Sequence, residues 1–297
     1  MLIANRPYLL LTLAVLFWAG NFILGRAFHT QIPPVALAFW RWFGAAVLVT
    51  LPSLKHLRQD RHILIAHWPI VLLLSALGIA AFNTLAYTGL QYTMALNAFL
   101  MQSMMPVLIV LMSFLIFRER VTRVQVLGIV VSLCGACMII IRGDLAVIMS
   151  LSLNRGDLLV FCAIVCYAGY SVMLRKRPHV HALSFIVVTF WVGTLILLPL
   201  YLWEALTVSS LPLRMSTFAV IGYVAIFPSI VSYLCYNRGV ELVGANRAGL
   251  FIHLMPVFGS IMAILFLDEV FSWFHLTGIL LIGAGIFLAT RSTKRPA

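Results

Sequence analysis

Ionisable side chains are scarce in this sequence, and few of them stand where they could do chemistry. Of its 297 residues, 63% are hydrophobic and only 9% are charged. The eight acidic residues all fall in expected loops or at expected helix ends, so the buried carboxylate relay of many ion-coupled membrane proteins is absent. His253 is the one histidine expected deep inside an apolar segment, which leaves no pair of axial haem ligands.

Other cofactor and metal motifs are also missing from the sequence. It contains no phosphate-binding loop and no zinc-spaced cluster. Cys134 and Cys137 form a C-x-x-C pair, which can be redox-active in a soluble protein. Here the pair falls inside an apolar segment, where thiols behave as small apolar groups. We therefore expect no metal, no cofactor and no enzymatic activity.

Polar and aromatic side chains recur at helical spacing inside six apolar segments. Each of them has the alternative role of a contact between helices, because Tyr, Ser and Asn commonly bridge membrane helices. As a set they favour a shared cavity, whose aromatic lining and few charges suit an apolar or zwitterionic solute. The candidate substrate-binding residues are Trp18, Asn21, Asn83, Tyr87, Asn97, Met101, Tyr167, Tyr170, Ser171, Tyr233, Tyr236 and His253.

Three further residues stand out inside apolar segments. Arg41 is the one basic residue well within a segment, and we expect it to snorkel toward the outer surface rather than contact substrate. Pro106 and Pro256 fall near the middle of their segments, and each frees a carbonyl four residues earlier, at Gln102 and Ile252. The prolines predict either static kinks or working hinges, and the freed carbonyls are candidate contacts for a substrate ammonium group.

These side chains would be positioned by apolar helices, each needing about 20 residues to cross a membrane. No small-residue cleavage site follows the first segment, so we expect that segment to stay in the mature protein. Ten segments qualify: 8–28, 34–51, 68–90, 95–117, 123–141, 156–174, 182–203, 215–237, 245–267 and 273–291. We predict an all-α integral membrane protein with ten transmembrane helices.

The formal net charge of +12 follows the pattern of membrane topology. If the N-terminus is cytoplasmic, fifteen of the 20 Lys and Arg residues fall on the cytoplasmic side and four on the other. Both termini are therefore predicted to be cytoplasmic. The basic residues form no face interleaved with aromatic side chains, so we expect the lipid bilayer, and no nucleic acid, as the macromolecular partner.

The sequence repeats itself at an offset of about 150 residues. Met105-Pro106-Val107 recurs as Met255-Pro256-Val257, and Glu119 recurs as Glu269. We predict a first five-helix repeat at 1–149 and a second at 150–297. Because five is odd, the second repeat must enter the membrane inverted. Inverted repeats are typical of secondary transporters, which bind substrate between the repeats near the membrane midplane.

Two stretches carry a resemblance to a known family. The stretch Phe17-Trp18-Ala19-Gly20-Asn21-Phe22 and the block Phe39-Trp40-Arg41-Trp42 resemble the first two helices of EamA-type drug/metabolite transporters. The duplicated Pro-Val, Glu and Gly pattern resembles that family's repeat, and the resemblance covers essentially the whole chain. It implies a ten-helix exporter in the bacterial cytoplasmic (inner) membrane, working by alternating access. Among its branches, the YddG-like exporters of aromatic or other neutral amino acids are preferred.

Two alternative functions stay open. A sugar-phosphate or nucleotide-sugar antiporter of the same superfamily should place several Lys or Arg residues in the cavity, and only Arg41 is available. A membrane-embedded lipid-modifying enzyme should carry a catalytic cluster at one membrane interface, and the sequence offers none.

Coupling and assembly give two last expectations. His253 is the only central side chain expected to titrate near neutral pH, so transport either follows the substrate gradient or depends on His253 for proton coupling. Small residues at helical spacing in 123–141 and 273–291 predict close helix packing. The same residues could alternatively form the interface of a homodimer.

Overall fold

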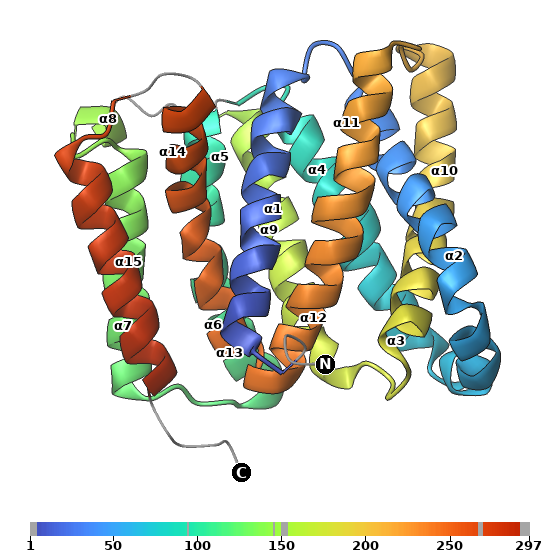
Figure 1. The fold of residues 1–297 in the computed structure, drawn as a ribbon, viewed down its shortest axis with the longest axis horizontal. Helices are drawn as coiled ribbons and strands as arrows, with labels where there is room; N and C mark the ends of the chain where they lie inside the picture. The colour runs from blue at the N-terminus through green and yellow to red at the C-terminus, as the bar shows by residue number, and fades with distance from the viewer. Residues whose placement is uncertain (1–4, 94, 145, 150–153, 267–269, 292–297) are drawn as a thin grey trace.

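The computed structural model describes residues 5–93, 95–144, 146–149, 154–266 and 270–291. Within these ranges the chain forms helices and no strand, and the long helices stand side by side in one layered bundle (Figure 1). Nine helical stretches in the described ranges are long and apolar enough to cross a membrane. This is the architecture of a multi-pass membrane protein. The first helix begins and the last ends on the same side of the bundle (Figure 1), and the cytoplasmic location of that side stays a prediction.

Five of the expected segments form single helices close to the predicted bounds. These are α1 (Pro7–Ala27), α7 (Arg123–Ile140), α9 (Arg155–Met173), α10 (Ala182–Thr207) and α15 (Trp273–Arg291). Two short elements, α8 (Ala146–Met149) and η2 (Leu174–Lys176), flank α9.

The second predicted segment, 34–51, ends too early. The helix α2 (Pro34–Ala66) continues for 33 residues and carries Pro52 in its interior. Two hydroxyls stabilise the carbonyls around this proline, because Thr50 Oγ1 donates to Ala46 O at 2.7 Å and Ser53 Oγ donates to Thr50 O at 2.9 Å. The basic residues expected in a loop after position 51 therefore lie on a helix.

The remaining four segments are interrupted helices. Segment 68–90 comprises α3 (Trp68–Leu74), the π-helical η1 (Ser75–Ala81) and α4 (Phe82–Gly89), and 95–117 comprises α5 (Ala95–Gln102) and α6 (Met105–Phe117). Segment 215–237 comprises α11 (Met215–Ala225), the π-helical η3 (Ile226–Val231) and α12 (Ser232–Val243). Segment 245–267 comprises α13 (Ala245–Leu250), the 3-10 turn η4 (Phe251–His253) and α14 (Leu254–Phe266). This last segment is not among the nine candidate spans, so the tenth crossing stays a prediction.

The interruptions recur at the 150-residue offset. The π-helical stretches η1 and η3 correspond, and the break between α5 and α6 corresponds to η4. Pro106 is therefore not in mid-helix but near the start of α6, and Pro256 is near the start of α14. Proline is tolerated there because the first N–H groups of a helix have no partner within the helix. The prolines mark where the chain restarts a helix, and their role as hinges stays a prediction.

The small residues of α7 and α15 pack against each other within one chain. A Cβ atom on Gly128 would lie 2.6 Å from Gly285 O, and one on Gly135 would lie 2.7 Å from Gly278 O. The close packing predicted from these glycines is confirmed. Because the two faces cover each other, these residues supply no surface for a homodimer, which stays a prediction without this support. Glu269, the repeat partner of Glu119, lies outside the described residues.

The other helices pack in matching pairs around the centre of the bundle. Helix α1 packs on α12 and α14, while α9 packs on α4 and α6. Helix α2 runs along α10 on the outer side (Figure 1). The buried core follows these contacts and contains the largest enclosed side chains, among them Trp42, Arg41, Tyr167 and Tyr233. A charged side chain at this depth directs attention to the centre of the bundle.

Candidate functional site

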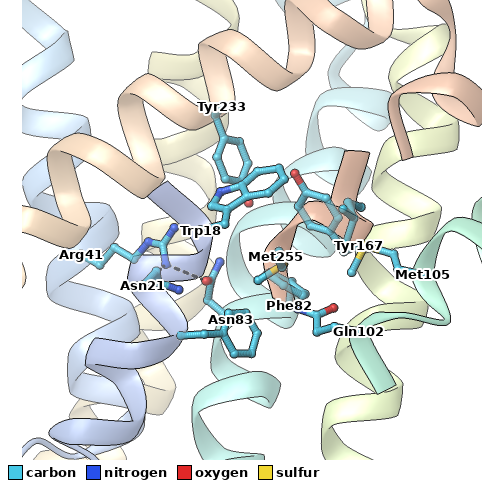
Figure 2. A pocket seen from close by; sticks show the side chains of 12 residues that line it. Trp18, Asn21, Arg41, Phe82, Asn83, Gln102, Met105, Tyr167, Tyr233 and Met255 are labelled. Carbon is cyan, nitrogen blue, oxygen red and sulfur yellow. Dashed lines mark hydrogen bonds between the residues drawn. The ribbon is translucent and has the colours of Figure 1, made fainter. Parts of the chain in front are cut away.

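A narrow cavity of about 20 Å³ lies at the centre of the bundle, between helices of both halves (Figure 2). Five of the predicted binding residues line it: Trp18, Asn21, Asn83, Tyr167 and Tyr233. Its other lining residues are Phe22, Arg41, Phe82, Gln102, Met105, Ile252 and Met255. The cavity is thus mostly aromatic and aliphatic, with a few polar groups and one charge.

The prediction that Arg41 snorkels to the surface is wrong. Its side chain is buried, with 1% of its surface exposed, and points into the bundle. Nη1 donates to Asn21 Oδ1 at 3.1 Å and to Asn83 Oδ1 at 2.8 Å. Nε donates to Ser229 Oγ at 2.6 Å, and Nη2 donates to the carbonyl of Pro228 at 3.0 Å. These acceptors hold the guanidinium inside the bundle.

The acceptors around Arg41 are all neutral. Tyr87 Oη accepts from Nη1 at 2.8 Å and itself donates to Asn21 Oδ1 at 2.6 Å. The guanidinium carbon lies 4.7 Å from the centre of the Trp42 ring. Among the described residues no carboxylate forms an ion pair with Arg41. Burial of an ion costs several kcal/mol and is usually offset by an opposite charge, so this end of the cavity carries an unneutralised positive charge.

Aromatic rings form the wall on the other side of the cavity. The Trp18 ring lies 5.4 Å from the Tyr167 ring, measured between centroids. Tyr236 does not line the cavity, but its ring packs 5.0 Å from that of Trp18. Trp18 Nε1 donates to the carbonyl of Pro228 at 3.1 Å, and the Tyr233 hydroxyl donates to the carbonyl of Gly78. Both carbonyls belong to the π-helical stretches η3 and η1. Each wide turn therefore presents a carbonyl that orients one aromatic residue of the wall.

Two hydrogen-bonded pairs close the bundle on either side of the cavity. The Asn21–Tyr87 pair lies toward the side where α1 ends, and the Tyr170–Asn237 pair lies toward the side where α1 begins. Tyr170 Oη donates to Asn237 Oδ1 at 2.8 Å. Tyr170 follows Asn21 by 149 residues, and Asn237 follows Tyr87 by 150. The two halves thus make the same contact with the residue types exchanged.

A second, wider hollow of about 530 Å³ reaches the Tyr170–Asn237 pair from the side where α1 begins. Asn237 lines its floor, and Arg177 and Glu241 line its wall. Arg177 Nη2 pairs with Glu241 Oε2 at 2.6 Å. The hollow is lined by polar and apolar side chains in about equal measure, and the aromatic residues around Tyr170 separate it from the central cavity.

The structure does not bring every predicted binding residue to the cavity. His253 is fully buried between helices, where Nδ1 lies 2.7 Å from Ser132 Oγ and Nε2 lies 2.9 Å from the carbonyl of Ser103. Ser103 precedes His253 by 150 residues, so this contact joins equivalent positions of the two halves. Ser171 Oγ lies 2.9 Å from the Tyr236 hydroxyl and does not line the cavity, and Met101 packs against the core.

Asn97 also lies elsewhere, beside a buried carboxylate. Its Nδ2 is 3.4 Å from Asp157 Oδ2, and Asp157 also accepts a 2.5 Å hydrogen bond from Thr93 Oγ1. Glu204, which lies inside the last turns of α10, is buried too, and it accepts the amides of Val35 and Ala36 at the start of α2. Both carboxylates satisfy helix N-termini away from the cavity, as acidic residues commonly do.

Seven lining residues were not predicted to bind substrate, although several carried a signal. Gln102 and Ile252 were singled out through the prolines, and Met105 and Met255 through the repeat. Arg41 was the lone basic residue of an apolar segment. Sequence patterns identified these positions. The directions of the Gln102, Met105, Ile252 and Met255 side chains depend on the breaks between α5 and α6 and at η4, which no spacing rule reveals.

Comparisons with known proteins agree along the whole chain. The model of the EamA-like transporter family matches residues 5–141 and 154–291. "Uncharacterized transporter YyaM" of Bacillus subtilis is 28% identical over 97% of this chain and 95% of its own. An "Uncharacterized transporter" of Archaeoglobus fulgidus is 26% identical over 96% of this chain and 98% of its own. A crystal structure with a TM-score of 0.76 and 19% identity covers 96% of both chains, which shows a shared fold.

Proposed function

The chain belongs to the EamA-like transporter family, and from that premise we propose that it exports small neutral amino acids, aromatic ones among them, across the bacterial cytoplasmic membrane. The relatives are named as transporters without a substrate, so the substrate must be argued from the cavity. Two relatives from Bacillus subtilis support a bacterial location.

The single observation that carries the proposal is the buried, unneutralised Arg41 at one end of an aromatic cavity. A carboxylate of the solute would supply the missing anion, and a guanidinium is well suited to hold one. The rest of the lining offers apolar surface from Phe22, Phe82 and Met255 to a side chain. A small solute with one carboxylate and an otherwise uncharged, apolar or aromatic body satisfies both ends.

The same cavity favours an amino acid over a sugar phosphate. A phosphate monoester carries close to two negative charges at neutral pH, and phosphate sites normally gather several Lys or Arg residues. Among the described lining residues Arg41 is the only charged side chain. One guanidinium balances one carboxylate.

We propose that the carrier works by alternating access between two inverted repeats, 1–149 and 150–297. The paired glycine contacts support this, since position 128 meets 285 while 135 meets 278, the reciprocal pattern that a two-fold axis produces. The Asn21–Tyr87 and Tyr170–Asn237 pairs act as the two closures of the cavity. Solute enters from the hollow beside Asn237 when the Tyr170–Asn237 pair separates, and leaves when the Asn21–Tyr87 pair separates.

Arg41 links the solute to the second closure. Its Nη1 holds both members of the Asn21–Tyr87 pair. A carboxylate bound at Arg41 competes for these hydrogens and weakens the pair. The carrier with bound solute therefore opens toward the side where α1 ends more readily than the empty carrier. A ligand can shift a conformational equilibrium only through such a difference in its interaction with the two states.

The proposal is tested with purified protein in vesicles that contain no other carrier. We expect uptake of labelled L-phenylalanine and L-leucine, and none of glucose 6-phosphate. Arg41→Gln should abolish amino-acid uptake, whereas the exposed Arg214→Gln, a matched loss of one charge, should leave it unchanged. Transport of the sugar phosphate in place of amino acids would reject the proposal.

A further inference from the structure

Three buried polar atoms of residues that line the central cavity have no hydrogen-bond partner. One is Nδ2 of Asn83, whose Oδ1 accepts from Arg41, and the other two belong to Gln102 and Tyr167. Gln102 Oε1 and the Tyr167 hydroxyl meet no hydrogen-bond partner, although Gln102 is only 3% exposed and Tyr167 only 2%. Both residues line the cavity. A buried polar atom without a partner is costly, so such groups are normally satisfied by protein, water or ligand.

These two residues lie across the cavity from the positive charge. Figure 2 shows Arg41 and Asn21 at one end, and Gln102 and Tyr167 at the other. Gln102 Oε1 can only accept a hydrogen bond, whereas Arg41 can only donate. The cavity thus has a donor end and an acceptor end.

Aromatic and sulfur-containing side chains complete the acceptor end. The Phe82 ring lies 4.7 Å from the Tyr167 ring, measured between centroids, and Met105 also lines the cavity. An ammonium group is attracted by aromatic faces as well as by carbonyl oxygens. No acidic residue lines the cavity in the described part of the chain, so this end suits the ammonium of a zwitterion rather than a free cation.

We infer that Gln102 Oε1, assisted by the Tyr167 hydroxyl, receives the ammonium group of the substrate, so that these two residues select α-amino acids over other carboxylates. This inference rests on the proposed function, in which Arg41 binds the carboxylate. It fixes the direction of the solute, with its carboxylate toward the Asn21–Tyr87 pair and its ammonium toward α5.

The test compares three solutes that share a carboxylate and a benzyl group. L-Phenylalanine carries an α-ammonium, 3-phenyllactate an α-hydroxyl, and 3-phenylpropionate neither. Protonated monocarboxylic acids cross bilayers unaided, so affinity is measured by titration calorimetry on the full chain in detergent micelles. We expect the wild type to bind phenylalanine about tenfold or more tightly than 3-phenylpropionate, because the acceptor end is unsatisfied with the latter. Phenyllactate should fall between them.

The variants separate recognition from folding. Gln102→Leu and Tyr167→Phe should weaken phenylalanine binding about tenfold while 3-phenylpropionate binds as it does to the wild type, which a misfolded protein could not do. Gln31→Leu and Tyr92→Phe make the same substitutions at exposed positions outside the cavity and should change neither affinity.

Each outcome decides between the two proposals. A preference for phenylalanine that survives both cavity variants overturns the inference and leaves amino-acid transport standing. Equal wild-type affinity for all three solutes, or equal affinity for phenylalanine and phenyllactate, overturns the inference and leaves a carboxylate carrier. A wild-type protein that binds none of them overturns the proposed function together with the inference.

Discussion

Weakening one closure should open the cavity from one side only. The Tyr170–Asn237 pair is a single buried hydrogen bond between neutral groups, 2.8 Å long. Such a bond contributes about 1 kcal/mol net. Tyr170→Phe removes it while keeping the ring that packs on Tyr167 and Tyr233. The population open toward the side where α1 begins should therefore rise about fivefold.

The other closure should respond more strongly. Tyr87→Phe removes the bond to Asn21 and also the bond from Arg41, and hydrogen bonds to charged groups contribute about 1.5–3 kcal/mol. Opening toward the opposite side should rise about 10- to 150-fold. The two variants thus differ in both the face they open and the size of the effect.

The assay measures the labelling rate of a single cysteine introduced by Met105→Cys, because Met105 lines the cavity and is buried. The five native cysteines are replaced by serine, and an impermeant thiol reagent is applied to one face of oriented vesicles at a time. Tyr170→Phe should accelerate labelling only from the side where α1 begins, and Tyr87→Phe only from the other. Tyr92→Phe, on an exposed tyrosine, should accelerate neither. Equal acceleration from both faces, or none, would refute the assignment of the two pairs as closures.

Three further results are expected. Gly135→Ala places a Cβ 2.7 Å from Gly278 O and should lower the free energy of unfolding of the detergent-solubilised protein by about 1–3 kcal/mol. Gly283→Ala, whose Cβ has no atom within 4 Å, should not lower it. Equal unfolding temperatures for the two variants would contradict the packing account. His253→Gln should lower the stability of the protein and leave the pH dependence of transport unchanged, because His253 bonds Ser132 and Ser103 outside the cavity. Loss of the effect of a pH gradient in vesicles would instead make His253 the coupling group. Burial and the neighbouring His56 lower the pKa of His181, and Asp60 opposes them, so His181 binds a proton less readily in the folded protein than in the unfolded chain. The stability of the start of α10 should therefore be full above a pH of about 6.5 and decline below it. Amide exchange at Leu183 that does not change between pH 7.5 and 5.5 would contradict this.

The helical fold was accessible from sequence because long apolar segments have few alternatives in a membrane. Hydropathy does not reveal interruptions of a helix within an apolar segment. The π-helical stretches at Ser75–Ala81 and Ile226–Val231 leave the apolar pattern intact, and α2 continues through Pro52, with hydroxyls of Thr50 and Ser53 bonded to carbonyls nearby. These are local exchanges of hydrogen bonds that residue types permit without requiring.

The cavity was predicted in part, for a related reason. Helical spacing placed Trp18, Asn21 and Tyr233 on inward faces, where they line the cavity. It also placed His253 inward, but this residue bonds the other half instead. Arg41 was misjudged because its acceptors come from three separate stretches of chain: Asn21 on α1, Asn83 and Tyr87 on α4, and Pro228–Ser229 on η3. No single helix reveals that convergence.

The central claim is that Arg41 binds the carboxylate of a transported amino acid. It is tested most directly by the binding of L-phenylalanine and L-phenylalaninamide, which lacks the carboxylate charge, to the wild type and to Arg41→Gln by titration calorimetry. A charge-assisted bond of about 1.5–3 kcal/mol predicts that the wild type prefers the acid by about 10- to 150-fold, and that Arg41→Gln loses this preference. Equal wild-type affinity for the acid and the amide, or a preference that survives in Arg41→Gln, would contradict the account.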